Sequence, residues 1–420
     1  MRLIPVIIIF MIMVYVPSAL YSRHIMKKTR SITESVVGAF AVPTFIILGI
    51  ILINRATLVN ILDTRFMIWS LWVFLLIYLP LNIYSLFYVI NKAIKLYAKR
   101  TFKSINYTGL VLAGIVAFAI ILGAATRHHI KVRKTTIYSK NLPAKFDGLR
   151  IAHITDLHLG NLSPRDNYLK KIVTKLTEIR PDMLVFTGDM MNISAEEVEG
   201  LDGLFDTIDA PYGRYAVMGN HDYGDYKDWK SEEAKEANLM AAYEAYRRVG
   251  FVLLNDSVAK LTWEHYSPSS DSCSISIINI IGVENCGKPP FPHYGDLAKA
   301  TEMIEPAQFH LPQCYNSLAE PAQFNILLSH DPTHWREEVL KEEYKYIDLT
   351  LSGHTHSAQI GINLGNFKWS PSQWLFDQWD GLYEKDNQYL FVSRGLGYVG
   401  IPFRLGMPAE ISIIELRTEN

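Results

Sequence analysis

The sequence predicts a membrane-embedded amino-terminal region followed by an α/β domain. Four long apolar segments fill the first third of the 420 residues. The remainder alternates short apolar runs with stretches of helical periodicity, which is the pattern that builds α/β layers. Five of these apolar runs end in Asp, Asn or His, residues that bind metal ions through oxygen or nitrogen. We therefore expect a metal site in the second part of the chain.

Each apolar segment is close to the roughly 20 residues that a helix needs to cross a bilayer, and none contains a charged residue. The segments are residues 3–20, 36–53, 66–90 and 109–125. We predict four transmembrane helices within residues 1–126. The first segment has an alternative interpretation as a cleaved signal peptide, because Pro17-Ser18-Ala19 resembles a small-residue cleavage site. Its long apolar run with only Arg2 ahead of it favours the transmembrane interpretation.

The distribution of basic residues bears on the orientation of these helices. Most of them lie in the loops after the first and third segments: Arg23, Lys27, Lys28, Arg30, Lys92, Lys95, Lys99, Arg100 and Lys103. By the positive-inside rule these loops are cytoplasmic, which places the carboxyl-terminal domain outside the cell membrane or in the periplasm. A basic cluster just past the fourth segment, Arg127, Lys131, Arg133 and Lys134, favours the opposite orientation.

The overall charge excludes one class of partner. The chain has 41 Lys and Arg against 42 Asp and Glu, so it carries no basic surplus of the kind that binds nucleic acid. Three cysteines, Cys273, Cys286 and Cys314, are too few for a disulfide framework. A single Cys273–Cys286 bridge would be compatible with an oxidising compartment.

Residues 127–146 read as a linker plus a first strand, and residues 147–420 as the α/β domain. Apolar residues from Leu169 to Ile179 recur at helical spacing, and Pro181 ends that helix. Ser194 with Glu197 has the spacing of a capping box that opens a helix. Residues 232–248 read as another helix with Gly250 as its stop, and residues 275–281 as a strand.

The polar residues that end the five apolar runs occur in compact motifs. In the first, Asp156 and His158 lie two apart in an extended segment, so both side chains point the same way and can reach one metal. The other motifs are Thr187-Gly188-Asp189, Gly219-Asn220-His221-Asp222, Ser329-His330 and Gly353-His354-Thr355-His356. This set contains no cysteine, which suits Mn, Fe, Zn or a similar divalent ion better than a thiolate site.

These five motifs resemble, in order, those of the calcineurin-like metallophosphoesterases. The flanking residues 147–150 and 393–397 are most similar to the membrane-associated bacterial branch of that superfamily. The resemblance implies two packed mixed β-sheets flanked by helices, with the metals at the strand ends. The family often has Gly-Gly after the last histidine, where this sequence has Ser357-Ala358, so the shape of that loop is expected to differ.

The resemblance also implies a role for each motif residue and two divalent metal ions as cofactors. Asp156, His158 and His356 would bind the first metal; Asn220, His330 and His354 the second; and Asp189 would bridge both. A hydroxide held between the metals would attack phosphorus. His221 would act on the leaving group as general acid or donor, with Asp222 orienting its ring.

Two features bear weakly on the substrate. Arg394 and Arg404 lie in the family-like tail and could form a fork for phosphate, although structural ion pairing is an equal alternative. The aromatic residues Trp369, Trp374, Phe376 and Trp379 crowd the segment after the last motif. They could lie at headgroup level and admit a lipid, with packing inside the domain as the alternative.

The predicted function is therefore hydrolysis of a phosphodiester or pyrophosphate by a membrane-anchored metallophosphoesterase. Anchoring makes sense if the substrate is itself held in the bilayer, so a lipid-linked phosphoester is expected. One alternative is a pyrophosphohydrolase of a UDP-sugar-lipid of the lipid A precursor type. Another is a membrane sensor or scaffold whose domain only binds, which the complete set of motif residues disfavours.

Overall fold

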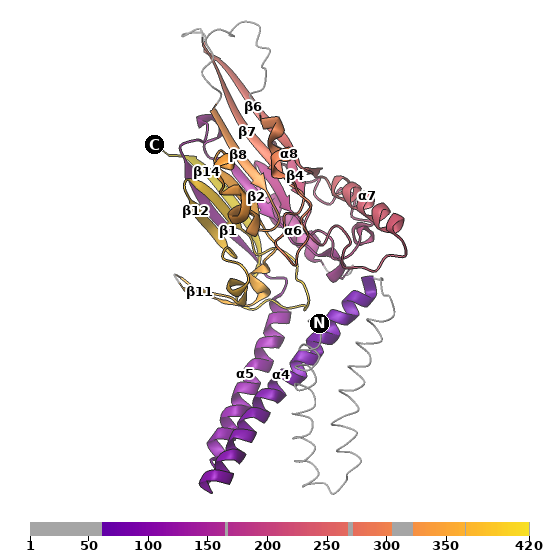
Figure 1. Ribbon diagram of the computed structural model, residues 1–420, viewed down its shortest axis with the longest axis vertical. Coiled ribbons are helices and arrows are strands. Elements are labelled where there is room, and N and C mark those ends of the chain that lie inside the picture. Colours follow the sequence, from indigo (N-terminus) through magenta and orange to yellow (C-terminus); the bar gives the residue numbers. More distant parts are fainter. Residues whose placement is uncertain (1–60, 164–166, 268–271, 305–321, 366, 420) are drawn as a thin grey trace. The chain divides into compact units, whose positions relative to one another are not determined.

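The computed structural model describes residues 61–163, 167–267, 272–304, 322–365 and 367–419 (Figure 1). The chain divides into two units. The helical unit contains two long helices together with Gly400–Leu405, and the α/β unit contains His128–Val399 and Gly406–Asn420. The predicted apolar segments 3–20 and 36–53 lie outside the described residues.

The helical unit consists of α4 (Ile61–Ala98) and α5 (Lys103–Thr126), at the positions of the third and fourth predicted segments. Both are long and apolar enough to cross a membrane, and they are the two such helices in the described part of the chain. A side chain at Gly109 would collide with Phe87, and one at Gly123 with Phe403. These glycines therefore permit the close packing expected of a small-residue helix in a membrane.

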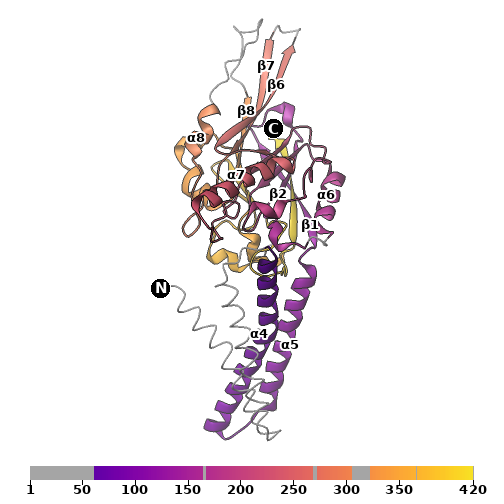
Figure 2. The same ribbon diagram turned by 90° about the vertical axis from the view of Figure 1, so that its right-hand side faces the viewer.

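The α/β unit contains two six-stranded sheets, which confirms the predicted α/β architecture of two packed mixed sheets (Figures 1 and 2). The first has the order β1-β14-β2-β3-β4-β5 and the second β12-β13-β9-β8-β7-β6. The strands of the first sheet are β1 (Ile130–Ser139), β2 (Arg150–Ile154), β3 (Met183–Thr187), β4 (Arg214–Val217), β5 (Val252–Leu253) and β14 (Ala409–Thr418). Those of the second are β6 (Ser257–Ser267), β7 (Ser272–Gly282), β8 (Ala322–Leu328), β9 (Leu349–Ser352), β12 (Gly381–Lys385) and β13 (Gln388–Val392).

Pairing within the sheets places the motif-bearing strands side by side. β2, β3 and β4 are consecutive and parallel, and so are β8 and β9. Every residue of β3 and β9 is buried, which explains their continuous apolar sequences. The two sheets pack through a shared core that includes Ile151, Val185, Ile326 and Leu351. This core fixes the strand ends on which the motif residues lie.

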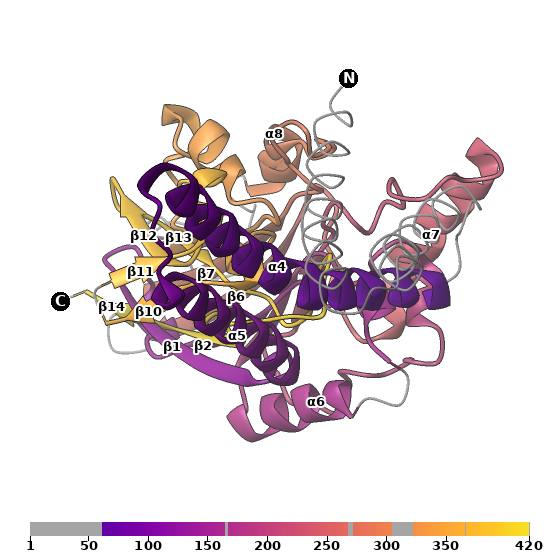
Figure 3. The ribbon, with the colours of Figure 1, turned by 90° about the horizontal axis from the view of Figure 1, so that it is seen from below.

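Helices cover both outer faces of the paired sheets, and Figure 3 shows α6 (Tyr168–Ile179) and α8 (Leu297–Thr301) on opposite sides. The prediction for residues 169–179 is confirmed, and the helix ends with Arg180 in a left-handed conformation. The predicted helix 232–248 is α7 (Glu232–Arg248). The helix predicted after Ser194 is only a four-residue 3-10 turn, Ala195–Val198.

A small antiparallel hairpin stands apart from both sheets. It consists of β10 (Ile362–Leu364) and β11 (Phe367–Trp369), and a 3-10 turn, Pro371–Trp374, follows it. Cys286, which lies in the loop after β7, is a free, buried thiol, so it forms no bridge with Cys273. Burial raises the pKa of this thiol, which makes it unreactive.

Candidate metal centre

The carboxyl ends of five strands converge on one cluster of polar side chains. Asp156 and His158 follow β2, Asp189 follows β3, and Asn220 follows β4. His330 follows β8, and His354 and His356 follow β9. Because the carboxyl ends of parallel strands meet at the same edge, each sheet delivers its own motif residues together. All of these side chains are buried or nearly so, with Asp156, His158 and His330 at 0% exposure.

Most of these residues adopt an unusual backbone conformation. A positive φ is found at Asp156 (55°), His158 (46°), Asp189 (58°), His354 (68°) and His356 (49°). Such angles are uncommon for residues other than glycine, and they cost free energy that the surrounding structure must offset. Strain of this kind clusters at functional sites, where it directs a side chain that a relaxed strand end would point elsewhere.

Asp156, His158 and His356 form the first group of potential ligands. The Nε2 atoms of His158 and His356 are 3.0 Å apart. Nε2 of His356 lies 3.2 Å from Oδ1 of Asp156, and Nε2 of His158 lies 4.0 Å from the same oxygen. Three ligand atoms that face one another at these distances provide one side of a metal site.

Asp189, His330 and His354 form a second group, and Asp189 also belongs to a third group with His158 and His221, which links the second group to the first. Oδ2 of Asp189 lies 3.1 Å from Nε2 of His330 and 3.6 Å from Nε2 of His158. Nδ1 of His354 lies 3.2 Å from Nε2 of His330. Asp189 is therefore the one residue within reach of both groups, which is the place that a bridging carboxylate takes in two-metal sites.

Asn220 provides a separate indication that a cation fits here. Its Nδ2 donates to the hydroxyl of Tyr226 at 2.7 Å, which fixes the direction of the amide. Its Oδ1 is buried and has no hydrogen-bond partner. Leaving a buried acceptor unsatisfied is costly, so this oxygen needs an electron-pair acceptor that the described side chains do not supply. The donor set of carboxylate, amide and imidazole groups suits divalent metal ions.

The electrostatics of the cluster favour a cation as well. Burial acts to lower the pKa of His330, but the Asp189 carboxylate outweighs it and raises that pKa to about 10. Burial acts to raise the pKa of Asp189, but His330 and His221 hold it well below its usual range. The buried Asp189 carboxylate is thus ionised, while burial lowers the pKa of His158 and of His354. An ionised carboxylate beside neutral imidazoles is the combination that binds metals.

Hydrogen bonds to neighbouring backbone groups orient the ligands. Nδ1 of His330 lies 2.6 Å from the carbonyl oxygen of Thr187, and since a carbonyl only accepts, Nδ1 carries a proton. A metal that displaces the other proton would therefore bind at Nε2. The backbone N–H of His354 donates to both oxygens of Asp156, at 3.2 and 3.1 Å. These bonds fix the side of each ring that faces the cluster.

His221 lies at the edge of the cluster. Its ring packs edge-on against His158 at 4.8 Å between centroids and stacks on Tyr226 at 4.3 Å. Its Nδ1 lies 2.7 Å from the carbonyl oxygen of Asn192. The group that contacts Nδ1 is thus the Asn192 carbonyl and not the predicted Asp222 carboxylate.

Asp222 instead supports the loops that carry the ligands. Its carboxylate accepts the backbone N–H groups of Asp189, Met191 and Gly219 at 2.8–2.9 Å. The hydroxyl of Tyr246 donates to it as well. Burial and then the charge of Asp189 raise the pKa of Asp222 to about 6. His221 and Asp222 lie in a turn that the Asp222 N–H closes by donating to the Gly219 carbonyl at 3.1 Å, and in this turn the Asp222 carboxylate reaches back to the loop after β3.

Sequence reasoning also missed the part that Glu197 plays. Its buried carboxylate accepts four backbone N–H groups, those of Gly160, Asn192, Ile193 and Ser194. The bond to Asn192 positions the residue whose carbonyl holds His221. The spacing of Ser194 and Glu197 indicated a helix cap, but it gave no sign of the contact with the distant Gly160.

The two arginines proposed for substrate binding are both 1% exposed. Arg394 donates to both carboxylate oxygens of Asp380, at 2.7 and 3.0 Å, and thus forms the structural ion pair that was the alternative. Arg404 belongs to the helical unit, where its backbone N–H donates to the carbonyl of Gly123. Neither guanidinium group is exposed in this structure, and a phosphate fork formed by these two residues stays a prediction.

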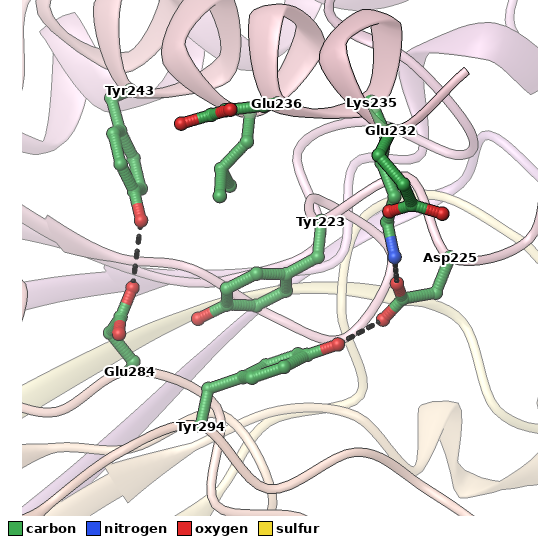
Figure 4. Close-up of a pocket in the computed structure, with 9 residues that line it drawn as sticks. Tyr223, Asp225, Glu232, Lys235, Glu236, Tyr243, Glu284 and Tyr294 are labelled. Atoms are coloured by element: carbon green, nitrogen blue, oxygen red, sulfur yellow. Dashed lines mark hydrogen bonds and ion pairs between the residues drawn. The ribbon is translucent and has the colours of Figure 1, made fainter. Parts of the chain in front are cut away.

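A cavity of about 330 Å³ is lined by the loop that follows Asp222 and by one face of α7 (Figure 4). The hydroxyl of Tyr294 donates to Asp225 at 2.6 Å, and Lys235 pairs with the same carboxylate. Tyr243 donates to Glu284 across the cavity at 3.0 Å. These contacts hold the loop that carries Asn220 and His221.

Comparison with known proteins agrees with this geometry. The family model for the calcineurin-like phosphoesterase matches residues 149–358. The chain is 27% identical over 297 residues to the metallophosphoesterase YkuE of Bacillus subtilis, an alignment that covers 70% of this chain and 87% of that protein. It is 27% identical over 288 residues to the UDP-2,3-diacylglucosamine pyrophosphatase LpxG of Chlamydia trachomatis, with 63% and 83% covered. A Danio rerio transmembrane protein with a metallophosphoesterase domain is 27% identical over 311 residues, with 73% and 62% covered.

Proposed function

Because this chain belongs to the calcineurin-like phosphoesterase family, we propose that it hydrolyses a lipid-linked phosphodiester or pyrophosphate with two divalent metal ions. The protein is a metallophosphoesterase, a membrane-associated hydrolase of phosphoester bonds. The observation that carries the proposal is the position of Asp189 between two groups of ligands from different strands. A single metal would not need both groups.

Asp156, His158 and His356 would hold one metal, Asn220, His330 and His354 the other, and Asp189 both. Bound divalent ions lower the pKa of a water molecule toward neutrality and offset the charge that grows on phosphoryl oxygens. The oxygen and nitrogen donors suit Mn, Fe, Zn or a similar divalent ion.

His221 would protonate the leaving group or donate to a phosphoryl oxygen. The Asn192 carbonyl can only accept, so Nδ1 of His221 carries a proton in every state of the ring. Nε2 is therefore the ring nitrogen from which a proton could pass to the leaving oxygen. The contact of the ring with His158 keeps this nitrogen beside the ligand cluster.

A substrate held in the bilayer is supported by two observations. The chain carries two helices long and apolar enough to cross a membrane. The relatives include pyrophosphatases whose named substrate, UDP-2,3-diacylglucosamine, carries acyl chains. The second of these favours a specific alternative, in which the scissile bond is the pyrophosphate of a UDP-sugar-lipid. A binding-only domain fits less well, because it would have no use for the buried, unsatisfied oxygen of Asn220.

Turnover of two artificial substrates tests the proposal. With added Mn²⁺, the full chain in detergent should hydrolyse bis-p-nitrophenyl phosphate, a diester, faster than the monoester p-nitrophenyl phosphate. The Asp189→Ala variant should lose this activity because it removes the shared ligand. Equal turnover by the variant would exclude this site as the catalytic one.

We also propose that the helices form a four-span anchor with the α/β unit on the outer side of the membrane. The support is the concentration of Lys and Arg in the loops after the first and third segments. Labelling of intact cells with an impermeant maleimide tests the orientation. A cysteine introduced at the exposed Met240 should react without permeabilisation, and reaction only after permeabilisation would contradict it.

A further inference from the structure

The hairpin of β10 and β11 has one apolar face and one polar face. Ile362 lies opposite Trp369 and Leu364 opposite Phe367 in its register, whereas Asn363 lies opposite Lys368. Since side chains alternate along a strand, the four apolar residues share one side. Leu364 is 72% exposed and Phe367 58% exposed. Within the described residues, the two-stranded hairpin has no further strand and no sheet that covers this face.

The apolar face continues into the turn that follows. Trp369 packs edge-on against Trp374, with ring centroids 5.9 Å apart. Trp374 is 72% exposed and its neighbour Leu375 is 80% exposed. We refer to Ile362, Leu364, Phe367, Trp369, Trp374 and Leu375 as the apolar rim. Exposed large apolar groups scattered singly need no explanation, but a continuous set of this kind marks an interaction surface.

The apolar rim is connected directly to the loop that carries two of the proposed ligands. The hydroxyl of Ser370 donates to the carbonyl of Ser357 at 2.6 Å, and that of Thr355 donates to the carbonyl of Trp379 at 2.8 Å. Phe376, the residue after Leu375, faces the ring of His354 at 5.4 Å between centroids. The same short segment thus contacts the ligand loop on one side and presents its apolar residues to the outside on the other.

The chain between α5 and the first sheet is short. Only Arg127, His128 and His129 separate the end of α5 from Ile130, a distance of roughly 14 Å at full extension. Ile130 pairs with Ala409 at the start of β14, and Gly406 pairs with Ile360 at the root of the hairpin. Within the α/β unit the hairpin lies at the end opposite the β6–β7 extension (Figure 1). A bilayer that α5 leaves at Thr126 would therefore lie within roughly 14 Å of Ile130.

We propose that the apolar rim inserts into the interfacial layer of the bilayer and holds the metal centre at headgroup depth. Tryptophan and leucine side chains are suited to that layer, and a phosphate held by a lipid lies at the same depth. The polar face of the hairpin stays outside, where Lys368 pairs with Asp380. Insertion itself does not depend on which phosphoester is cleaved, so it can be tested separately from the proposed function.

Insertion is measured with the full chain reconstituted in vesicles of phosphatidylcholine and phosphatidylglycerol. In a variant with Cys273, Cys286 and Cys314 replaced by alanine, single cysteines at Leu364 or Leu375 carry an environment-sensitive fluorophore. Met240, which is 60% exposed on α7, is the matched control site. Spin-labelled lipids should quench the labels at 364 and 375 roughly twofold more than the label at 240. Equal quenching at the three sites would overturn the proposal. A label at 364 or 375 that is shielded by a second copy of the chain, and is therefore not quenched by the spin-labelled lipids, would overturn it as well.

Charged substitutions give a second readout. Leu364→Glu and Trp374→Glu should lower turnover of a phosphodiester embedded in vesicles by about tenfold or more, since a glutamate opposes insertion. Both should leave turnover of soluble bis-p-nitrophenyl phosphate unchanged, and Met240→Glu should change neither. An equal loss of turnover on both substrates would show that these residues shape the active site and do not insert into the bilayer. If the unsubstituted protein does not hydrolyse soluble bis-p-nitrophenyl phosphate at all, that result would contradict the proposed function and not the insertion.

Discussion

The backbone N–H of Asp189 donates to the carboxylate of Asp222 at 2.9 Å, so the shared ligand is positioned by a residue that does not face the metal cluster. The same carboxylate accepts the N–H of Gly219, one residue before Asn220. Asp222 thus links the loops after β3 and β4. It is a positioning residue, since its oxygens are occupied by backbone donors and by Tyr246.

Asp222→Asn should destabilise the protein even without metals. The new amide NH₂ group cannot accept a hydrogen bond, so a backbone N–H that donates to the Asp222 carboxylate would lose its acceptor. A buried N–H left unsatisfied in this way costs about 1–3 kcal/mol. Urea unfolding of chelator-treated protein measures this loss. Asp209→Asn, at an exposed carboxylate, is the control and should change the free energy of unfolding by less than about 0.5 kcal/mol. Equal effects of the two substitutions would contradict the positioning role.

Ala358→Gly should stabilise the protein. Ala358 is exposed and has a φ of 49°, a left-handed conformation that costs an alanine roughly 1 kcal/mol more than a glycine. Ser357 and Ala358 are the two positions at which calcineurin-like phosphoesterases often have glycine. The control is Ala241→Gly, at an exposed position within α7, which should destabilise by about 0.5–1 kcal/mol. Thermal unfolding in detergent should therefore show shifts of opposite sign, and a decrease for both would refute the strain at Ala358.

His221→Gln should impair turnover in a way that depends on the leaving group. An alkyl phosphodiester needs its leaving oxygen protonated, so loss of the imidazole should lower kcat by about 10²–10⁴. A p-nitrophenolate leaves without that proton, so its release should be much less affected. The ratio of the two effects across a series of leaving groups measures the role. A uniform decrease for all leaving groups would assign His221 to binding phosphoryl oxygen instead.

Asn192 offers no side chain to this step, since it holds His221 through its backbone. Asn192→Ala should therefore retain most of the activity that His221→Gln loses, while Glu197→Ala should lose activity because it releases the N–H of Asn192. Steady-state kinetics with an alkyl diester compares the two variants. A greater loss in Asn192→Ala than in Glu197→Ala would contradict this order.

The motif strands, and the convergence of the polar residues at their ends, could be predicted because both follow from local sequence patterns. An apolar run marks a buried strand, and parallel neighbours bring their carboxyl ends to one edge. Helices 168–179 and 232–248 followed from periodicity for the same reason. Nothing local indicated that β14 pairs in parallel with β1, since that contact joins residues far apart in the chain.

Side-chain partners that are distant in the chain could not be predicted. Arg394 was considered for phosphate because it lies in the family-like tail, but its partner, Asp380, belongs to no motif. The resemblance implied that Asp222 orients His221, whereas the groups that donate to the Asp222 carboxylate come from other loops and from Tyr246. Burial decides both cases, since a buried charge needs partners that only the folded chain identifies.

Metal content per chain tests the central claim most directly. Elemental analysis of the purified full chain, loaded with Mn²⁺ and freed of excess, should find two equivalents in the wild type. Asp189→Ala should lose both, and Asn220→Ala should keep about one, because only the second group loses a ligand. Two equivalents in Asp189→Ala would contradict an account in which this carboxylate holds both ions.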